Sequence, residues 1–208
     1  EQHTGIYAPR TQVSHIRQIK QGFEIHLTNE TIPLRARHVI NSAGLHATQL
    51  ASRIEGLDAT HIPQMHLAKG HYFEYNGKSP FKHLIYPVPV DGGLGVHVTL
   101  DMAGRMKFGP DVEWVTEINY ETSAERAISF YPSIRRYWPT LPDNSLQPAY
   151  TGMRPKLSGP GEAAADFYIQ DVNTHQVSGL ICLYGIESPG LTASLALAEE
   201  VVSLLDRS

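Results

Sequence analysis

The chain has 208 residues, 41% of them hydrophobic and 18% charged, which is ordinary for a globular protein that buries a core of its own. Its 17 basic and 21 acidic residues give a net charge of −4 and are spread along the sequence, so nucleic acid is not expected as a partner. A single cysteine, Cys182, excludes an internal disulfide, and no apolar run reaches the ~18 residues that cross a bilayer.

The first part of the chain is expected to hold short strands and one helix. Residues 13–19 and 22–28 are predicted to be strands, and the second alternates apolar and polar side chains as a half-buried strand does. A shorter strand over residues 38–41 runs into Ser42-Ala43-Gly44-Leu45, and a helix is expected through about Ile54. A strand, a small-residue turn and a helix in this order form a corner of the kind that approaches phosphates or rings.

The middle of the chain is richer in strands. We expect strands over residues 63–75, 84–88, 94–100 and 105–108, with a hairpin turn at Val90-Asp91-Gly92-Gly93 and a helical stretch over residues 123–137. Extended structure is expected again over residues 149–156, 167–171 and 180–184. A final helix over residues 191–205 places Leu191, Leu195, Ala198, Val202 and Leu205 on one face.

This order indicates a mixed fold of the α+β or α/β class, in which a central antiparallel sheet is flanked by pieces of a second α/β layer. The predicted boundaries are residues 1–62 for the first flanking piece, 63–150 for the β-rich domain and 151–208 for the last piece. Cys182 lies in an apolar run, so we interpret it as buried packing rather than as a nucleophile.

The most specific local pattern follows the apolar strand 180–184. It reads Gly185-Ile186-Glu187-Ser188-Pro189-Gly190-Leu191-Thr192 and precedes the final helix. The glycines and proline fix a tight turn, and the start of the helix presents free N–H groups with a partial positive charge. Such a corner suits an anion or an electron-rich ring oxygen. A plain strand-to-helix turn capped by Ser188 would account for the same residues.

Two further patterns carry side chains suited to acid chemistry. Arg154 lies between Gly152-Met153 and Pro155, which keeps it out of a helix, and an arginine so fixed can grip a carboxylate with two parallel hydrogen bonds. His97 and Thr99 point the same way on their strand, and a histidine that faces a pocket can act as a general base. The alternatives are an arginine paired to a structural acid and a histidine that only packs.

Fingerprints of phosphate and metal sites are missing. The nearest match to G-x-G-x-x-G begins at Gly93-Leu94-Gly95, but Val98 stands at its third glycine position and the match lies between a turn and a strand. No H-E-x-x-H, C-x-x-C or Walker pattern occurs, so no metal site is expected.

Together these motifs resemble the D-amino-acid-oxidase-like family of FAD oxidoreductases, and within it they are most similar to the L-2-hydroxyglutarate dehydrogenases and oxidases. The resemblance extends over nearly the whole chain and rests on seven motifs in order: Val39–Leu45, Lys69-Gly70-His71-Tyr72, Tyr86-Pro87-Val88-Pro89, Gly95-Val96-His97-Val98-Thr99, Gly109-Pro110, Gly152-Met153-Arg154-Pro155 and Gly185–Thr192.

The resemblance implies a Rossmann-like FAD domain in two-domain architecture, with FAD touched by Ala43, Gly44 and Leu45 and by Gly185, Ile186, Glu187, Ser188, Gly190, Leu191 and Thr192. It implies oxidation of a small 2-hydroxy acid, a secondary alcohol beside a carboxylate, to the 2-oxo acid, with hydride passing to flavin N5. His97 is expected to be the base and Arg154 to hold the C1 carboxylate, while Tyr86, Lys69 and Thr99 are weaker candidates for substrate contact. The glycine fingerprint of the family is expected upstream of residue 1, so the chain reads as a C-terminal fragment.

Two alternatives stay open at this point. One is an amine oxidase of the same superfamily acting on glycine, sarcosine or a D-amino acid, because a shared fold does not fix the substrate. The other is a non-catalytic ligand-binding fragment that lacks the nucleotide half. The electron acceptor, oxygen or a quinone, and the oligomeric state are not fixed by the sequence. A cytoplasmic location is expected, with peripheral membrane contact left open.

Overall fold

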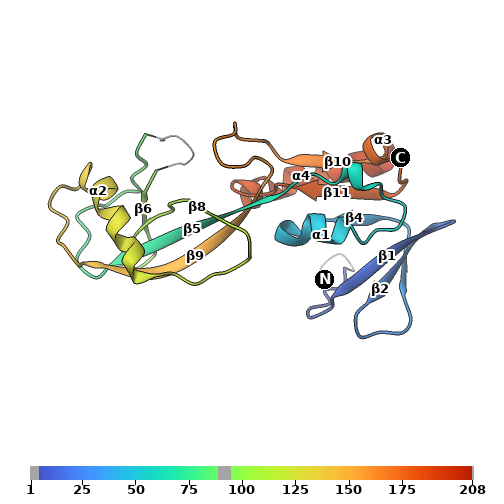
Figure 1. The fold of residues 1–208 in the computed structure, drawn as a ribbon, viewed down its shortest axis with the longest axis horizontal. Coiled ribbons are helices and arrows are strands. Elements are labelled where there is room, and N and C mark those ends of the chain that lie inside the picture. Colours follow the sequence, from blue (N-terminus) through green and yellow to red (C-terminus); the bar gives the residue numbers. More distant parts are fainter. Residues whose placement is uncertain (1–4, 89–94, 208) are drawn as a thin grey trace. The chain divides into compact units, whose positions relative to one another are not determined.

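A computed structural model describes residues 5–88 and 95–207, and the chain divides into two compact units (Figure 1). Unit 1 is formed by the chain up to Met65 and from Ala165 onward, and unit 2 by His66–Ala164. The predicted turn at residues 90–93 lies outside the described residues. The mixed α/β class with antiparallel sheets is confirmed.

Unit 1 contains two three-stranded sheets. In the first, β1 (Val13–Ile19), β2 (Gly22–Leu27) and β3 (Leu34–Ala36) are antiparallel neighbours in that order. In the second, the order is β10 (Tyr168–Gln170), β11 (Leu180–Tyr184) and β4 (Val39–Asn41), and β11 runs parallel to β4. The short helices η1 (Gly44–His46), α1 (Ala47–Ala51), η2 (Ala59–His61) and α3 (Val172–His175) and the long α4 (Gly190–Asp206) complete the unit.

Strand β11 is fully buried, as its continuous apolar run predicts. Ile181 and Leu183 pack with Val201 of α4, while Cys182 shares its buried side with Asn41 of β4. The predicted apolar face of the last helix differs from the buried one. The side chains of Leu191 and Leu195 are 92% and 80% exposed, because Val201, and not these leucines, packs α4 against β11.

Unit 2 is a five-stranded antiparallel sheet covered by helices on one face. Strand β5 (His66–Tyr75) is its centre; β9 (Leu146–Lys156) pairs along one side, and β7 (Met106–Gly109) and β8 (Glu113–Val115) share the other. Strand β6 (His97–Leu100) adds to β7. The helices η3 (Ala124–Ser129) and α2 (Phe130–Arg135) carry the core side chains that meet the sheet.

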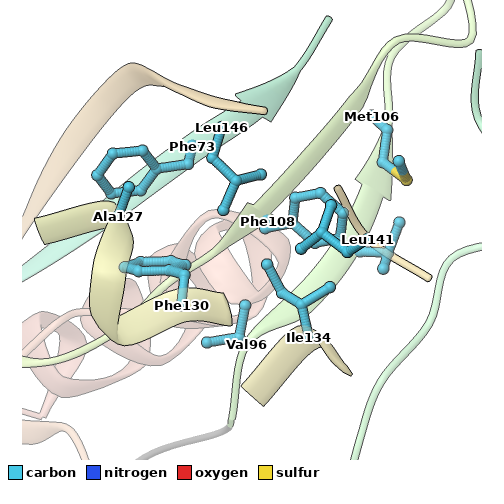
Figure 2. Packing of buried hydrophobic residues seen from close by; sticks show 10 residues of the cluster. Phe73, Val96, Met106, Phe108, Ala127, Phe130, Ile134, Leu141 and Leu146 are labelled. Carbon is cyan, nitrogen blue, oxygen red and sulfur yellow. The ribbon is translucent and has the colours of Figure 1, made fainter. Parts of the chain in front are cut away.

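Figure 2 shows this core, where Phe73, Phe108 and Leu146 of the sheet lie among side chains of the helical segment such as Phe130 and Ile134. We call this side of the sheet the helix face. Alternate residues of each strand point to the opposite side. On that side the rings of Tyr72 and Tyr150 stack at 4.3 Å, and we call it the tyrosine face.

One irregularity sets which residues of β9 reach the tyrosine face. Tyr72 pairs with Tyr150, but the next residue of β5, Phe73, pairs with Pro148, so Ala149 is an extra residue in β9. This bulge shifts the alternation of side chains by one position between the two halves of the strand. Leu146 therefore points to the helix face, whereas Tyr150, Gly152 and Arg154 point to the tyrosine face.

The end of the predicted central domain differs from the observed boundary. The sequence predicted the division between residues 150 and 151, whereas the structure assigns residues up to Ala164 to unit 2. The reason is that β9 continues to Lys156 and pairs with β5 along its whole length. The predicted strand over residues 84–88 is reduced to a single bridge between Ile85 and Val98.

Candidate functional site

The two segments expected to touch a cofactor meet at one edge of the second sheet of unit 1. Strands β4 and β11 are parallel neighbours, with Asn41 beside Cys182, so both strands end at the same edge. Ala43, Gly44 and Leu45 follow β4, and Gly185 to Thr192 follow β11. A crevice at the carboxyl ends of adjacent parallel strands is where α/β sheets bind ligands.

The backbone at this edge has the form that the glycines predict. Gly44 has φ +57° and Gly185 has φ +68°, which is the left-handed region that other residues avoid. A Cβ atom placed on Gly44 would meet nothing within 4 Å, so the chain leaves open space there. Gly190 has a different role, because a Cβ there would lie 2.6 Å from Cγ2 of Ile186.

The start of α4 leaves backbone donors free of side-chain capping. The N-cap of α4 is Pro189, and no side chain caps this helix. The alternative of a cap by Ser188 is therefore wrong. The N–H of Gly190 donates to the carbonyl of Glu187, while Leu191 and Thr192 stand in the first turn, where N–H groups lack intrahelical acceptors. Ser188, Leu191 and Thr192 are exposed, and Ile186 and Glu187 are half-buried. These donors fit an anionic or electron-rich group.

Asn41 positions this edge and was not among the residues predicted for the site. Its side chain is 1% exposed; it donates to the carbonyl of Ala47 at 2.8 Å and accepts from the N–H of Ala43 at 3.3 Å. It thereby ties the end of β4 to the start of α1 across Gly44. A buried asparagine at the end of an apolar strand was the signal that could have found it.

The residues expected to contact substrate belong to unit 2, and most of them share the tyrosine face. His97 pairs with Gly109 and Thr99 with Lys107, which places both away from Val98 and the core. His97 is 8% exposed, and its ring lies 4.3 Å from the ring of Tyr86, which is largely exposed. The structure thus brings His97, Thr99 and Tyr86 together.

Arg154 lies on the same face, farther along β9. It is half-buried and opposite Ala68. Gly152, between Tyr150 and Arg154 on that face, leaves open space, since a Cβ there would meet nothing within 4 Å. Three inter-strand spacings of about 4.8 Å separate the backbone of His97 from that of Tyr150, a distance of about 14 Å. Long side chains and a substrate between them can span such a face.

Lys69 is on the other side of the sheet. It is 6% exposed and pairs with Met153 and Glu113, so alternation turns it to the helix face, away from Arg154 and His97. There His71 donates from Nε2 to Glu113 at 2.7 Å, and Arg126 reaches Asp111 at 2.6 Å. The hydrogen bond from His71 lowers the pKa of Glu113 below its usual value. Lys69 therefore lies near Glu113, on the side of these ion pairs, and not with the set around Arg154.

Three residues of the tyrosine face were missed by the sequence analysis: Tyr72, Tyr150 and Lys107. The ammonium of Lys107 lies 5.2 Å from the centre of the Tyr150 ring. Burial, followed by the neighbouring Tyr72, raises the pKa of Tyr150 above its usual value. The strand spacing of Tyr72 and Tyr150 could have shown that each faces the same way, but only the register shows that they stack.

Other features limit the chemistry that these residues carry. Cys182 is fully buried and burial raises the pKa of its thiol, so it packs and is not a nucleophile. Among the residues that the structure describes, no helix is both long and apolar enough to cross a membrane, and no three acidic, histidine or cysteine side chains gather as metal ligands do.

Comparison with known proteins decides the family. Residues 1–204 match the profile of the family described as FAD dependent oxidoreductase. The chain belongs to this family of FAD-dependent oxidoreductases. It is 51% identical over 177 residues to L-2-hydroxyglutarate dehydrogenase, mitochondrial, of Arabidopsis thaliana, an alignment that covers 79% of this chain and 37% of the relative.

More distant relatives match the chain in sequence or in fold. Glycerol 3-phosphate dehydrogenase of Caloramator mitchellensis is 25% identical over 206 residues, covering 90% of this chain and 41% of the relative. A structure of dithionite-reduced L-α-glycerophosphate oxidase from Mycoplasma pneumoniae with FAD bound superposes with a TM-score of 0.77 at 24% identity, covering 94% of this chain and 50% of that one. The chain therefore spans half or less of the length of the relatives that it matches.

Proposed function

We propose that this protein oxidises a small 2-hydroxy acid resembling L-2-hydroxyglutarate to the 2-oxo acid, with FAD as the cofactor. The observation that carries the proposal is the common face of His97, Thr99 and Arg154 in unit 2, which offers a base and a carboxylate-binding cation on one sheet surface. The 51% identity to an L-2-hydroxyglutarate dehydrogenase supports the same substrate class.

FAD would be held in unit 1 by the edge formed by Ala43, Gly44 and Leu45 and by Gly185 to Thr192. The left-handed glycines allow close approach of the backbone, and the donors of the first turn of α4 suit negative charge on the ring system. The cofactor, when bound, supplies the acceptor for the hydride that leaves C2 of the substrate.

His97 would take the proton from the substrate hydroxyl, because an imidazole nitrogen can act as a general base and this ring is buried on the tyrosine face. Arg154 would hold the C1 carboxylate with two parallel hydrogen bonds and so fix the position of C2. Thr99 and Tyr86, which flank His97, would contact the remaining polar groups of the substrate. Lys69 is not part of this arrangement, because it points to the helix face.

A second candidate substrate is glycerol 3-phosphate. It is favoured by the relationship over 206 residues to a glycerol 3-phosphate dehydrogenase, and an arginine that binds a carboxylate also binds a phosphate. Both candidates are anionic secondary alcohols, so His97 and Arg154 would keep their roles.

The test is the visible absorption spectrum of the full-length protein before and after anaerobic addition of substrate. We expect flavin bands that bleach with L-2-hydroxyglutarate and persist with its D isomer and with glycine. Bleaching by glycerol 3-phosphate alone would assign the second candidate, and bleaching by glycine or another amine alone would move the protein to the amine oxidases. A full-length protein without flavin would contradict the proposal and favour a non-catalytic binding role.

A further inference from the structure

Lys107 occupies a central position on the tyrosine face. It stands on β7 between Thr99 of β6 and Glu74 of β5, and both are its direct cross-strand partners. Its ammonium group lies 5.2 Å from the centre of the Tyr150 ring, so the side chain extends across the sheet toward β9. A lysine in this position brings positive charge to the surface that carries His97 and Arg154.

Among the described residues, no carboxylate forms an ion pair with Lys107. Arg105, which precedes β7, donates to the carboxylate of Asp101 at 2.7 Å, a local pair within the turn between β6 and β7. Glu74 is directly opposite Lys107, yet the ammonium rests over an aromatic ring instead. A cation held by an aromatic face keeps hydrogen-bond donors available for an anionic ligand.

The tyrosines beside Lys107 form a stacked and partly exposed pair. Tyr72 and Tyr150 stack with their planes 15° apart, and Tyr150 is 47% exposed. Beyond them on the same face of β9 come Gly152, where a Cβ atom would meet nothing within 4 Å, and then Arg154. Two cations, Lys107 and Arg154, therefore flank a fixed aromatic pair and a glycine on the same face of the sheet.

We propose that Lys107 binds the second carboxylate of a dicarboxylate substrate, the one that Arg154 does not hold, and so makes the site selective for diacids over monoacids. This inference rests on the proposed oxidation of a 2-hydroxy acid and deepens it. A monocarboxylate leaves Lys107 without an anion, whereas a diacid satisfies both cations. Tyr72 and Tyr150 act as positioning residues that hold the lysine.

The test compares wild type with Lys107→Met in the full-length flavoprotein, using L-2-hydroxyglutarate and the monocarboxylate L-2-hydroxybutyrate. Loss of one charged hydrogen bond is expected to raise KM for the diacid about tenfold or more. KM for the monoacid should stay within about twofold, because that substrate makes no contact with Lys107. Lys82→Met removes an equal charge from an exposed position of unit 2 and should leave both values unchanged.

A binding measurement separates this role from an effect on turnover. Calorimetric titration with 2-oxoglutarate and with 2-oxobutyrate should give the same contrast in Kd, weaker by about tenfold for the diacid alone in Lys107→Met. Equal loss of affinity for both acids, or no loss for either, would overturn the inference. Wild-type behaviour tests the function separately: a protein whose flavin no 2-hydroxy acid bleaches fails the proposed function, whereas a bleaching protein with an indifferent Lys107 fails only the inference.

Discussion

Arg154 owes its place to its neighbours in the chain. Pro155 keeps the segment extended, and pairing with Ala68 on β5 puts a small residue across from the guanidinium. This small partner leaves room on the tyrosine face beside Arg154. In the proposed function, this arginine would hold the C1 carboxylate of the substrate with two parallel hydrogen bonds.

Replacing Arg154 by methionine should raise KM for L-2-hydroxyglutarate about a hundredfold, because a bidentate charged contact is lost. Lysine at this position should recover only part of the affinity, since it lacks the planar pair of donors. Steady-state kinetics of the full-length protein measure both. Arg136→Met, at an exposed position of unit 2, is the control, and an unchanged KM in Arg154→Met would remove this residue from the site.

His97→Gln should slow the reduction of the flavin by substrate by roughly a hundredfold or more, because a general base contributes at least that much. Anaerobic stopped-flow absorbance at saturating substrate measures this step directly. Glutamine keeps the polarity and most of the volume of the side chain, so flavin content should not change. His83→Gln, on an exposed histidine, should leave the rate unaltered. A rate within about threefold of wild type would show that another group is the base.

Side-chain direction was only partly predictable from the sequence. The pairing of His97 with Thr99 on one face followed from strand alternation, and the structure agrees. Lys69 was grouped with Arg154 because each lies in a characteristic motif. Only the register, with Ala68 opposite Arg154, shows that Lys69 points the other way. Stacking of Tyr72 on Tyr150 depends on the same long-range pairing, which local sequence does not encode.

At the scale of elements, β5 and β8 are held together by more than backbone pairing. His71 of β5 donates to Glu113 of β8, and Arg126 of η3 approaches the same carboxylate at 3.5 Å. One carboxylate therefore links two strands and a helix on the helix face. Because Glu113 is 37% exposed, solvent screens these contacts, and their contribution to stability is less than about 1 kcal/mol.

The lowered pKa of Glu113 gives a pH dependence with a definite sign. A carboxyl whose pKa is lower in the folded state stabilises the fold above its usual value of 4.5, and this contribution is lost as the pH falls through the folded-state pKa. Glu113→Gln should therefore lower the unfolding temperature at neutral pH and make little difference near about pH 3. Thermal unfolding of both proteins at several pH values tests this, and a gap that does not narrow in acid would refute it.

Strands and helices were predicted to different degrees. The corner after β4 and the buried β11 were predicted closely, because continuous apolar runs bounded by glycine are strong local signals. The three-residue strands β3 and β8 were missed, since each gains its extended form from a neighbour and not from its own pattern. The expected strand at 84–88 contains Pro87 and is followed in the sequence by Pro89, and a proline cannot donate to a ladder.

For the whole molecule, the mixed fold was predictable from the order of strands and helices, while the boundary between the units was not. The last connection between units follows the turn at Gly159, where Gly159 donates to the carboxylate of Glu162 at 2.7 Å. Residues 160–166 beyond it are exposed. The boundary was predicted too early because it was placed at the motif around Arg154. A motif of functional residues does not indicate where a packed unit ends.

Limited digestion of the full-length protein with elastase should cut after Ala163, Ala164 or Ala165, since proteases select exposed segments with small residues. Mass spectrometry of the fragments identifies the bond. Strand β9 should stay intact over the same time, because its backbone pairs with β5 along its length. Cleavage within β9 before the alanine segment would mean that unit 2 ends near residue 150, as the sequence alone had indicated.

The extra residue in β9 also determines how the strand would respond to a change in its length. The bulge absorbs Ala149, which has no partner on β5, so Tyr150 and the residues after it lie on the faces that a strand without this alanine would give them. Deletion of Ala149 would therefore restore regular pairing with β5 and leave Arg154 on the tyrosine face. Loss of the bulge with Ala149 retained would pair this alanine with Tyr72, turn Arg154 to the helix face and bring Met153 out in its place. The bulge, and not the number of residues in β9, thus decides which alternate side chains of the strand can meet a substrate.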